Sequence, residues 1–173
     1  MRGASGSFGI VTSIQVETFA APDSATVFSY SWDLSSADAA SAAQQFQNFV
    51  QTNVPQEFGG ELVFGRGSSS GRVSFALNGG WYAPDDQFAA VIAPFLNTLP
   101  TPSGQTVTPG TYIESVQNLS GLGRLNTIGI PDTNDTFYAK SLMTPEASPM
   151  TITTLNAFTS YLGDAGFTAD TVC

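Results

Sequence analysis

Apolar side chains recur along the chain in periods that predict strands alternating with helices. The clearest strand covers about residues 27–34, where apolar and small polar side chains alternate. Its apolar face carries Phe28, Tyr30, Trp32 and Leu34. An earlier segment, residues 10–18, has the same period of two and is broken by Pro22. Both segments therefore predict half-buried strands.

Two amphipathic helices are expected between the strands. Ser35 with Asp38 three residues later resembles a capping box, and the helix should continue to about Asn53, before Pro55. Its apolar face consists of Ala39, Ala42, Ala43, Phe46, Phe49 and Val50. A second helix should follow Pro84, with Pro94 kinking or splitting it. The apolar stripe of this helix consists of Phe88, Val91, Ile92, Phe95, Leu96 and Leu99.

The remaining elements complete the order. Strands are expected at about 58–65 and 72–78, joined as a hairpin by a Gly/Ser turn, and again at about 107–116 and 136–142, with a loop at 119–132 between the last two. A last helix should begin at Ser148-Pro149 and end at Gly163. Its inward side chains are expected to be Ile152, Leu155, Phe158, Tyr161 and Leu162.

This succession predicts an α+β fold. We expect an antiparallel sheet with the split βαβ (ferredoxin-like) order βαββαβ, a further strand and helix, and the helices on one face. A chain of 173 residues with 42% hydrophobic residues can bury a core of this kind.

Charge excludes some partners. The net charge is −9 and the five basic residues are scattered, whereas nucleic acids and anionic membranes bind clustered Lys and Arg. Apolar runs also fall short of the roughly 20 residues of a spanning helix. We therefore expect no nucleic-acid partner and no membrane partner.

Candidate chemistry is sparse. The chain has no histidine and one cysteine, Cys173, so a neutral imidazole base, a Ser-His or Cys-His pair and an ordinary zinc site are all excluded. Adjacent Asp85 and Asp86 are typical of a helix start, and Glu57 and Glu61 are interpreted as solvated. We expect no catalytic residue and no metal ligand.

Two features suggest carbohydrate binding or secretion of the protein. Trp81 and Tyr82, next to Gly79-Gly80, could form a stacking platform for a sugar ring, although aromatic residues at a strand end are more often core. Asn118 and Asn134 each begin a glycosylation sequon, which is typical of a secreted glycoprotein.

Two segments resemble one enzyme family. The stretch Arg2-Gly3-Ala4-Ser5-Gly6-Ser7-Phe8-Gly9-Ile10-Val11-Thr12 resembles the RGAGGxFGIVT segment of FAD-linked oxidases of the berberine-bridge-enzyme-like branch, in the vanillyl-alcohol-oxidase superfamily. The stretch Phe137-Tyr138-Ala139-Lys140-Ser141-Leu142-Met143-Thr144-Pro145 resembles the FYAKSL-T-P segment of fungal oligosaccharide oxidases in that branch. By pattern alone, the glycine segment is also consistent with a Gly/Ser leader that enters a strand.

The resemblance implies a domain division. Residues 1–20 would hold the glycine segment and last strand of an FAD domain, residues 21–163 part of a substrate-binding domain, and residues 164–173 a tail. Flavin contacts would fall on Gly6, Ser7, Gly9, Ile10 and Val11. The histidine that anchors the flavin in the family and the C-terminal Asn-Tyr-x-Asp-type motif with its catalytic tyrosine do not occur here. The resemblance also implies that Val63 stands where the fungal oxidases carry a polar side chain that hydrogen-bonds the sugar, and valine cannot make that hydrogen bond.

Two functions remain open. The resemblance implies part of a secreted FAD-dependent carbohydrate oxidase that binds oligosaccharide but is inactive alone and holds no cofactor by itself. The alternative is a stand-alone secreted binding or signalling protein, for example immunomodulatory or weakly sugar-binding, that reuses the fold. In either case we expect self-association through uncovered surfaces, with residues 10–19 pairing with a second copy.

Overall fold

The computed structural model describes residues 10, 12–52, 54–121, 123–126, 143–145, 147–164 and 171–172. Its elements are, in chain order, β1 (Ala25–Ser35), α2 (Ser36–Gln51), β2 (Phe58–Arg66), β3 (Arg72–Trp81), α3 (Asp85–Leu96), β4 (Gly104–Gly110), α4 (Tyr112–Leu119), α5 (Ile152–Leu162) and β5 (Thr171–Val172).

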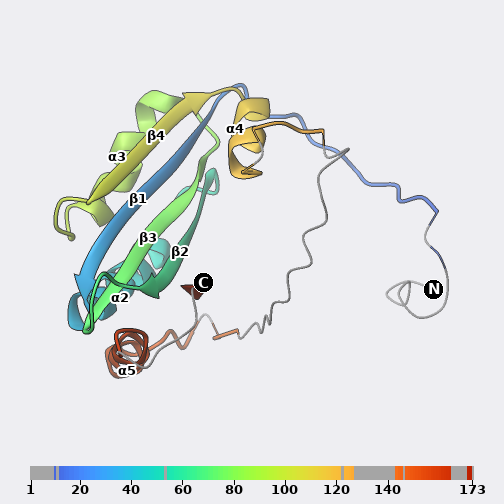
Figure 1. The fold of residues 1–173 in the computed structure, drawn as a ribbon. Coiled ribbons are helices and arrows are strands. Elements are labelled where there is room, and N and C mark those ends of the chain that lie inside the picture. The colour runs from blue at the N-terminus through green and yellow to red at the C-terminus, as the bar shows by residue number, and fades with distance from the viewer. Residues whose placement is uncertain are drawn as a thin grey trace.

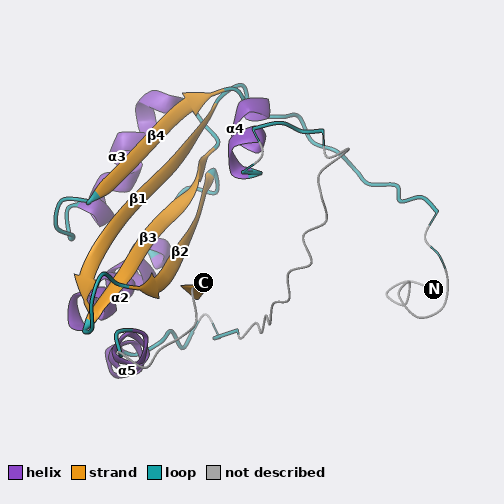
Figure 2. Ribbon diagram, viewed as in Figure 1, coloured by secondary structure: helices purple, strands orange, loops and turns teal. Residues whose placement is uncertain are grey.

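The strands form one antiparallel sheet in the order β4-β1-β3-β2-β5. Figures 1 and 2 show α2 and α3 behind this sheet, with α5 beside α2 at its lower end. The expected α+β class with an antiparallel sheet is therefore confirmed. The strands expected at 27–34, 58–65 and 72–78 and the helices expected after Ser35 and Pro84 are all present.

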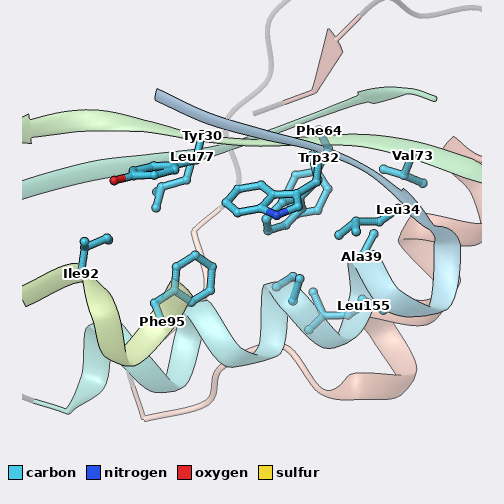
Figure 3. Close-up of a cluster of buried hydrophobic side chains, with 14 of the residues drawn as sticks. Tyr30, Trp32, Leu34, Ala39, Phe64, Val73, Leu77, Ile92, Phe95 and Leu155 are labelled. Carbon is cyan, nitrogen blue, oxygen red and sulfur yellow. The ribbon is translucent and has the colours of Figure 1, made fainter. Parts of the chain in front are cut away.

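The core lies between the sheet and these helices (Figure 3). The four apolar residues predicted on β1 are 1–5% exposed, and the ring of Phe28 stacks against those of Phe58 and Phe88 at centroid distances of 5.4 and 4.9 Å. Burying one side chain of this size completely adds about 1.5–3 kcal/mol to the free energy of unfolding. On α2 the buried residues are all alanine, which lets the helix backbone approach the sheet closely.

Specific polar contacts fix the helices on the sheet. Ser35 Oγ accepts a hydrogen bond from the Asp38 amide at 3.1 Å, which confirms the predicted cap of α2. The Gln47 side chain on α2 binds the Met150 backbone twice, donating to its carbonyl and accepting from its amide, both at 3.0 Å. Because Met150 lies just before α5, this double contact anchors the start of α5 on α2.

The strand expected at residues 10–18 is absent from the described part of that segment. Residues 12–22 belong to no helix or strand, and Ile14 and Val16 are 78% and 70% exposed. Both sides of β1, the strand that follows, are occupied by β3 and β4. Among the described residues, no strand pairs with this segment.

The strand expected at 107–116 is present only in its first part, residues 107–110. Strand β4 ends at Gly110, and α4 begins at Tyr112. Thr111 caps this helix: Glu114 Oε2 accepts from the Thr111 amide at 2.7 Å, and the Glu114 amide donates to Thr111 Oγ1 at 3.3 Å. This complete capping box begins a helix within residues that were expected to form a strand.

Smaller corrections concern the helices. Helix α5 begins at Ile152 with Thr151 as its N-cap, not at Ser148-Pro149, because the Thr151 hydroxyl accepts from the Thr154 amide. Tyr161 is 66% exposed rather than inward, as is Val50 on α2 at 44%.

Pro94 does not split α3, which continues to Leu96. The strand expected at 136–142 lies outside the described residues, as do half of the loop at 119–132 and most of the tail.

Asp33 joins β1 to the β2–β3 hairpin. Its carboxylate accepts from the Ser68 amide at 3.1 Å, the Ser68 hydroxyl at 2.6 Å and Arg72 Nε at 3.1 Å. The hydrogen bonds from Ser68, followed by the contact with Arg72, hold the pKa of Asp33 below its usual value of 3.8. A lowered folded-state pKa means that this group stabilises the fold above pH 3.8 and that its contribution is lost as pH falls through the lower folded-state value.

We predict that Asp33→Asn lowers the free energy of unfolding at neutral pH, because the amide cannot accept all three hydrogen bonds. The difference from the parent protein should shrink as pH falls below 3.8. Urea unfolding followed by circular dichroism at several pH values measures this. Asp23→Asn, at an exposed position before β1, is the matched control. A pH-independent difference would contradict the assignment.

Candidate functional site

The sheet face opposite the helices is lined by small and polar side chains. Successive strand residues point to opposite faces, so the neighbours of the buried residues lie here. On β1 and β3 these are Val27, Ser29, Ser31, Asp33, Ser74, Ala76, Asn78 and Gly80. Across the strands, Ser29 Oγ donates to Asn78 Oδ1 at 2.7 Å. We call this surface the open face.

A groove of about 270 Å³ lies at one end of the open face. Helix α4, which packs against β1, contributes Leu119 to its rim. The other lining residues come from β2, β3 and the residue after β3, and they are Gly59, Gly60, Glu61, Asn78, Gly79, Gly80 and Tyr82. The groove thus combines a carboxylate, an amide, an aromatic ring and bare backbone.

The bare backbone comes from two facing glycine pairs. Gly59 pairs with Gly80, and Gly60 pairs with Gly79. A Cβ atom on Gly79 would overlap the Gly59 carbonyl oxygen and lie 2.7 Å from Phe28 Cζ, whereas one on Gly59 would have only the Gly80 carbonyl oxygen near, at 3.9 Å. Core packing therefore requires glycine at 79, while Gly59 only opens the groove.

Tyr82 forms one side of the groove. A Cβ atom on Gly80 would lie 2.8 Å from Tyr82 Oη, so the phenol ring is folded back over that glycine. The ring also lies 6.1 Å, centroid to centroid, from Tyr112 at the start of α4. The Tyr82 amide donates to the Glu57 carbonyl at 2.9 Å, which fixes the backbone at this point.

The two aromatic residues singled out in the sequence have different positions. Trp81 is 2% exposed and its indole N–H donates to the Pro84 carbonyl at 2.8 Å, so it lies in the core, the second of the two interpretations. Tyr82 lies in the groove. Glu61, which the sequence indicated to be solvated, is exposed and lines the groove. Asn78 was not among the predicted site residues, although Gly79-Gly80 directly follows it.

Most of the predicted flavin contacts lie outside the described part of the chain. These are Gly6, Ser7, Gly9 and Val11, while the side chain of Ile10 is described and is 93% exposed. The flavin contacts therefore stay a prediction, and we derive no redox step from them. Val63 lies on the open face, two residues beyond Glu61 on β2.

The other predictions from the sequence concern glycosylation, metal binding and the membrane. Asn118 is exposed on α4, and Asn134 lies outside the described residues. Among the described residues, no three His, Cys, Asp or Glu side chains are grouped as metal ligands. None of the helices described here has the length and apolar character needed to cross a bilayer.

We predict that Gly79→Ala destabilises the protein by about 1–3 kcal/mol, because the added methyl group must displace Phe28 or the β2 backbone. Gly59→Ala adds the same methyl group on the open side and should change stability by less than about 1 kcal/mol. Urea unfolding of both variants measures the difference. Equal destabilisation would contradict the assignment of the two glycines to different faces.

Comparisons with known proteins identify similar chains. No family model matches. A carbohydrate oxidase from Microdochium nivale is 30% identical over an alignment of 148 positions, which covers 82% of this chain and 28% of that protein. A chitooligosaccharide oxidase from Gibberella zeae is 27% identical over an alignment of 176 positions, which covers 96% of this chain and 32% of that protein.

Solved structures share the fold. The structure of FgChi7B superposes with a TM-score of 0.65 at 23% identity, over 83% of this chain and 28% of that one. A variant of berberine bridge enzyme superposes with a TM-score of 0.50 at 18% identity, over 60% of this chain and 20% of that one.

The chain thus spans 28% and 32% of the lengths of the two curated relatives. The two sequence motifs, the curated relatives and the shared fold agree with one another. The chain is therefore related, over part of their length, to the FAD-linked oxidases of the berberine-bridge-enzyme-like branch.

Proposed function

We propose that this chain is part of the substrate-binding domain of a secreted FAD-dependent carbohydrate oxidase, and that its open face binds oligosaccharide. The observation that carries the proposal is the groove at Gly59 and Gly80, on the face that the helices leave uncovered. The names of the two curated relatives support carbohydrate as the ligand class.

The groove offers the contacts that a sugar ring uses. The Tyr82 ring supplies an apolar face for stacking against C–H groups, and the Glu61 carboxylate can accept hydrogen bonds from hydroxyl groups. The Asn78 carbonyl oxygen accepts from Ser29, which directs its amide nitrogen to a ligand hydroxyl. The glycine floor lets a sugar ring approach the backbone closely.

The proposed role is binding and orientation, without oxidation by this chain alone. The sequence contains no histidine to anchor a flavin or act as a neutral base. In the proposed division, residues 1–20 belong to the FAD domain, residues 21–163 to the substrate-binding domain and residues 164–173 to a tail. We also propose that the sheet is of the split βαβ type, which the order of elements from β1 to β4 supports.

Secretion and glycosylation are part of the same proposal. Asn118 is exposed near the end of α4, where an attached glycan would meet solvent. Asn134 is the second proposed acceptor.

We predict that the chain binds chitin- or cellulose-derived oligosaccharides saturably and that Tyr82→Ala weakens this binding about tenfold through loss of ring stacking. Isothermal titration calorimetry measures both affinities. Tyr161→Ala, which removes a 66%-exposed tyrosine from α5 on the other side of the sheet, should bind like the parent chain. Binding that is unaffected at Tyr82 would place the sugar elsewhere, and no binding would refute the proposal.

We further predict that the purified chain shows no flavin absorbance band and releases no hydrogen peroxide with the same oligosaccharides. A visible absorption spectrum and a peroxidase-coupled assay test this, with added free FAD as the control. Peroxide release by the chain would contradict the proposal that this chain does not oxidise carbohydrate by itself.

A further inference from the structure

A row of three polar side chains crosses the open face beside the glycine floor of the groove. Ser29 on β1 pairs with Asn78 on β3, and Asn78 pairs with Glu61 on β2. All three side chains point to the open face, because they alternate with core residues along their strands. Strand pairing inside the described part of the chain thus fixes a row that presents a hydroxyl, an amide and a carboxylate, in that order.

The rows on either side of this one are uncharged. They consist of Val27, Gly80 and Gly59 on one side and of Ser31, Ala76 and Val63 on the other. Glu61 is also the one charged side chain among the described residues that line the groove. The groove therefore has a negative charge at one point of its lining, next to neutral surfaces.

The carboxylate is placed to meet a substituent of a bound sugar ring. A ring stacked on Tyr82 would lie over Gly59 and Gly80, because the phenol ring is folded back over Gly80. Glu61 lies two residues beyond Gly59 on β2, which is about 6.6 Å along a strand. A substituent of the stacked ring, or the next ring of the same oligosaccharide, spans that distance.

A single carboxylate in this setting suits an organic cation better than a metal ion. Cations that prefer oxygen take several oxygen ligands, and no three His, Cys, Asp or Glu side chains are grouped in the described part of the chain. An ammonium group instead carries three hydrogen-bond donors, and a carboxylate beside an amide oxygen can accept from it. Glu61 and Asn78 supply that pair.

We propose that Glu61 makes the groove selective for oligosaccharides of amino sugars, such as those of glucosamine, over neutral oligosaccharides. A protonated amine adds charge attraction to the hydrogen bond that a neutral hydroxyl group on the same ring carbon makes. An acetylated amine is neutral, so it gains nothing from the charge of the carboxylate. This inference rests on the proposed carbohydrate function, because it names the ligand class of the same groove.

Three trisaccharides that differ only in the substituent at the second carbon of each ring test the selectivity. They are the matched trimers of glucosamine, N-acetylglucosamine and glucose. Isothermal titration calorimetry of the full chain in a mildly acidic buffer, where the amine is protonated, measures the three affinities. The glucosamine trimer should bind about fivefold more tightly than either neutral trimer. Added salt should reduce this preference, because it screens an exposed charge pair.

Glu61→Gln removes the charge and keeps the size of the side chain. It should abolish the preference for the glucosamine trimer and change the affinity for the glucose trimer by less than about twofold. Asp86→Asn is the matched control, because it removes the same charge at an exposed position of α3, behind the sheet in Figure 1. This control should keep the preference, and circular dichroism checks the fold of both variants.

The outcomes separate this inference from the function on which it rests. Binding of the glucose trimer that Tyr82→Ala weakens, without a preference for the glucosamine trimer, would overturn the inference and leave the carbohydrate function in place. A preference that survives Glu61→Gln, or that Asp86→Asn removes equally, would overturn the inference as well. If none of the three trimers binds saturably, both proposals are refuted.

Discussion

The close contact between the Phe28 ring and the backbone of Gly79 is the constraint on which both the core and the groove depend. Phe28 is 1% exposed and stacked between Phe58 and Phe88, and its ring occupies the space that a side chain at position 79 would need. The partner strand must also come close, because the Gly59 carbonyl lies where the same side chain would be. The core therefore keeps this part of β3 bare, and the opposite side of the same backbone becomes the floor of the groove.

The two faces of the sheet therefore have different roles, because one holds the core and the other forms the groove. The helix-covered face holds the aromatic and aliphatic core, and α2 approaches it through a face of four alanines. The open face carries hydroxyl, amide and carboxylate groups that make few demands on packing. A substitution on the open face can therefore alter what the groove binds while the core remains unchanged, as the different surroundings of Gly59 and Gly79 show.

Helix α4 gives the groove its second wall. It follows β4 directly, and its capping box between Thr111 and Glu114 turns the chain across the open face, so that Leu119 and Tyr112 come close to Tyr82. The Thr-x-x-Glu signature of this helix start is present in the sequence at Thr111 and Glu114, within a segment that was expected to be a strand. The hydrogen bonds of the capping box favour the helix, because they satisfy backbone amides at the start of α4 that would otherwise be left to solvent.

The sequence by itself determined the elements with strong periods: the apolar row of β1, the alanine face of α2, the hairpin of β2 and β3, and the stripe of α3. It also indicated the related family through two short motifs. Only the tertiary structure decided which neighbour each residue met. It buried Trp81 and left Tyr82 in the groove, although the two are adjacent, because successive strand residues face opposite sides of a sheet. Within the described part of the chain it also left residues 12–19 without a strand partner, since periodicity describes a segment's own faces and not whether an edge beside it is open.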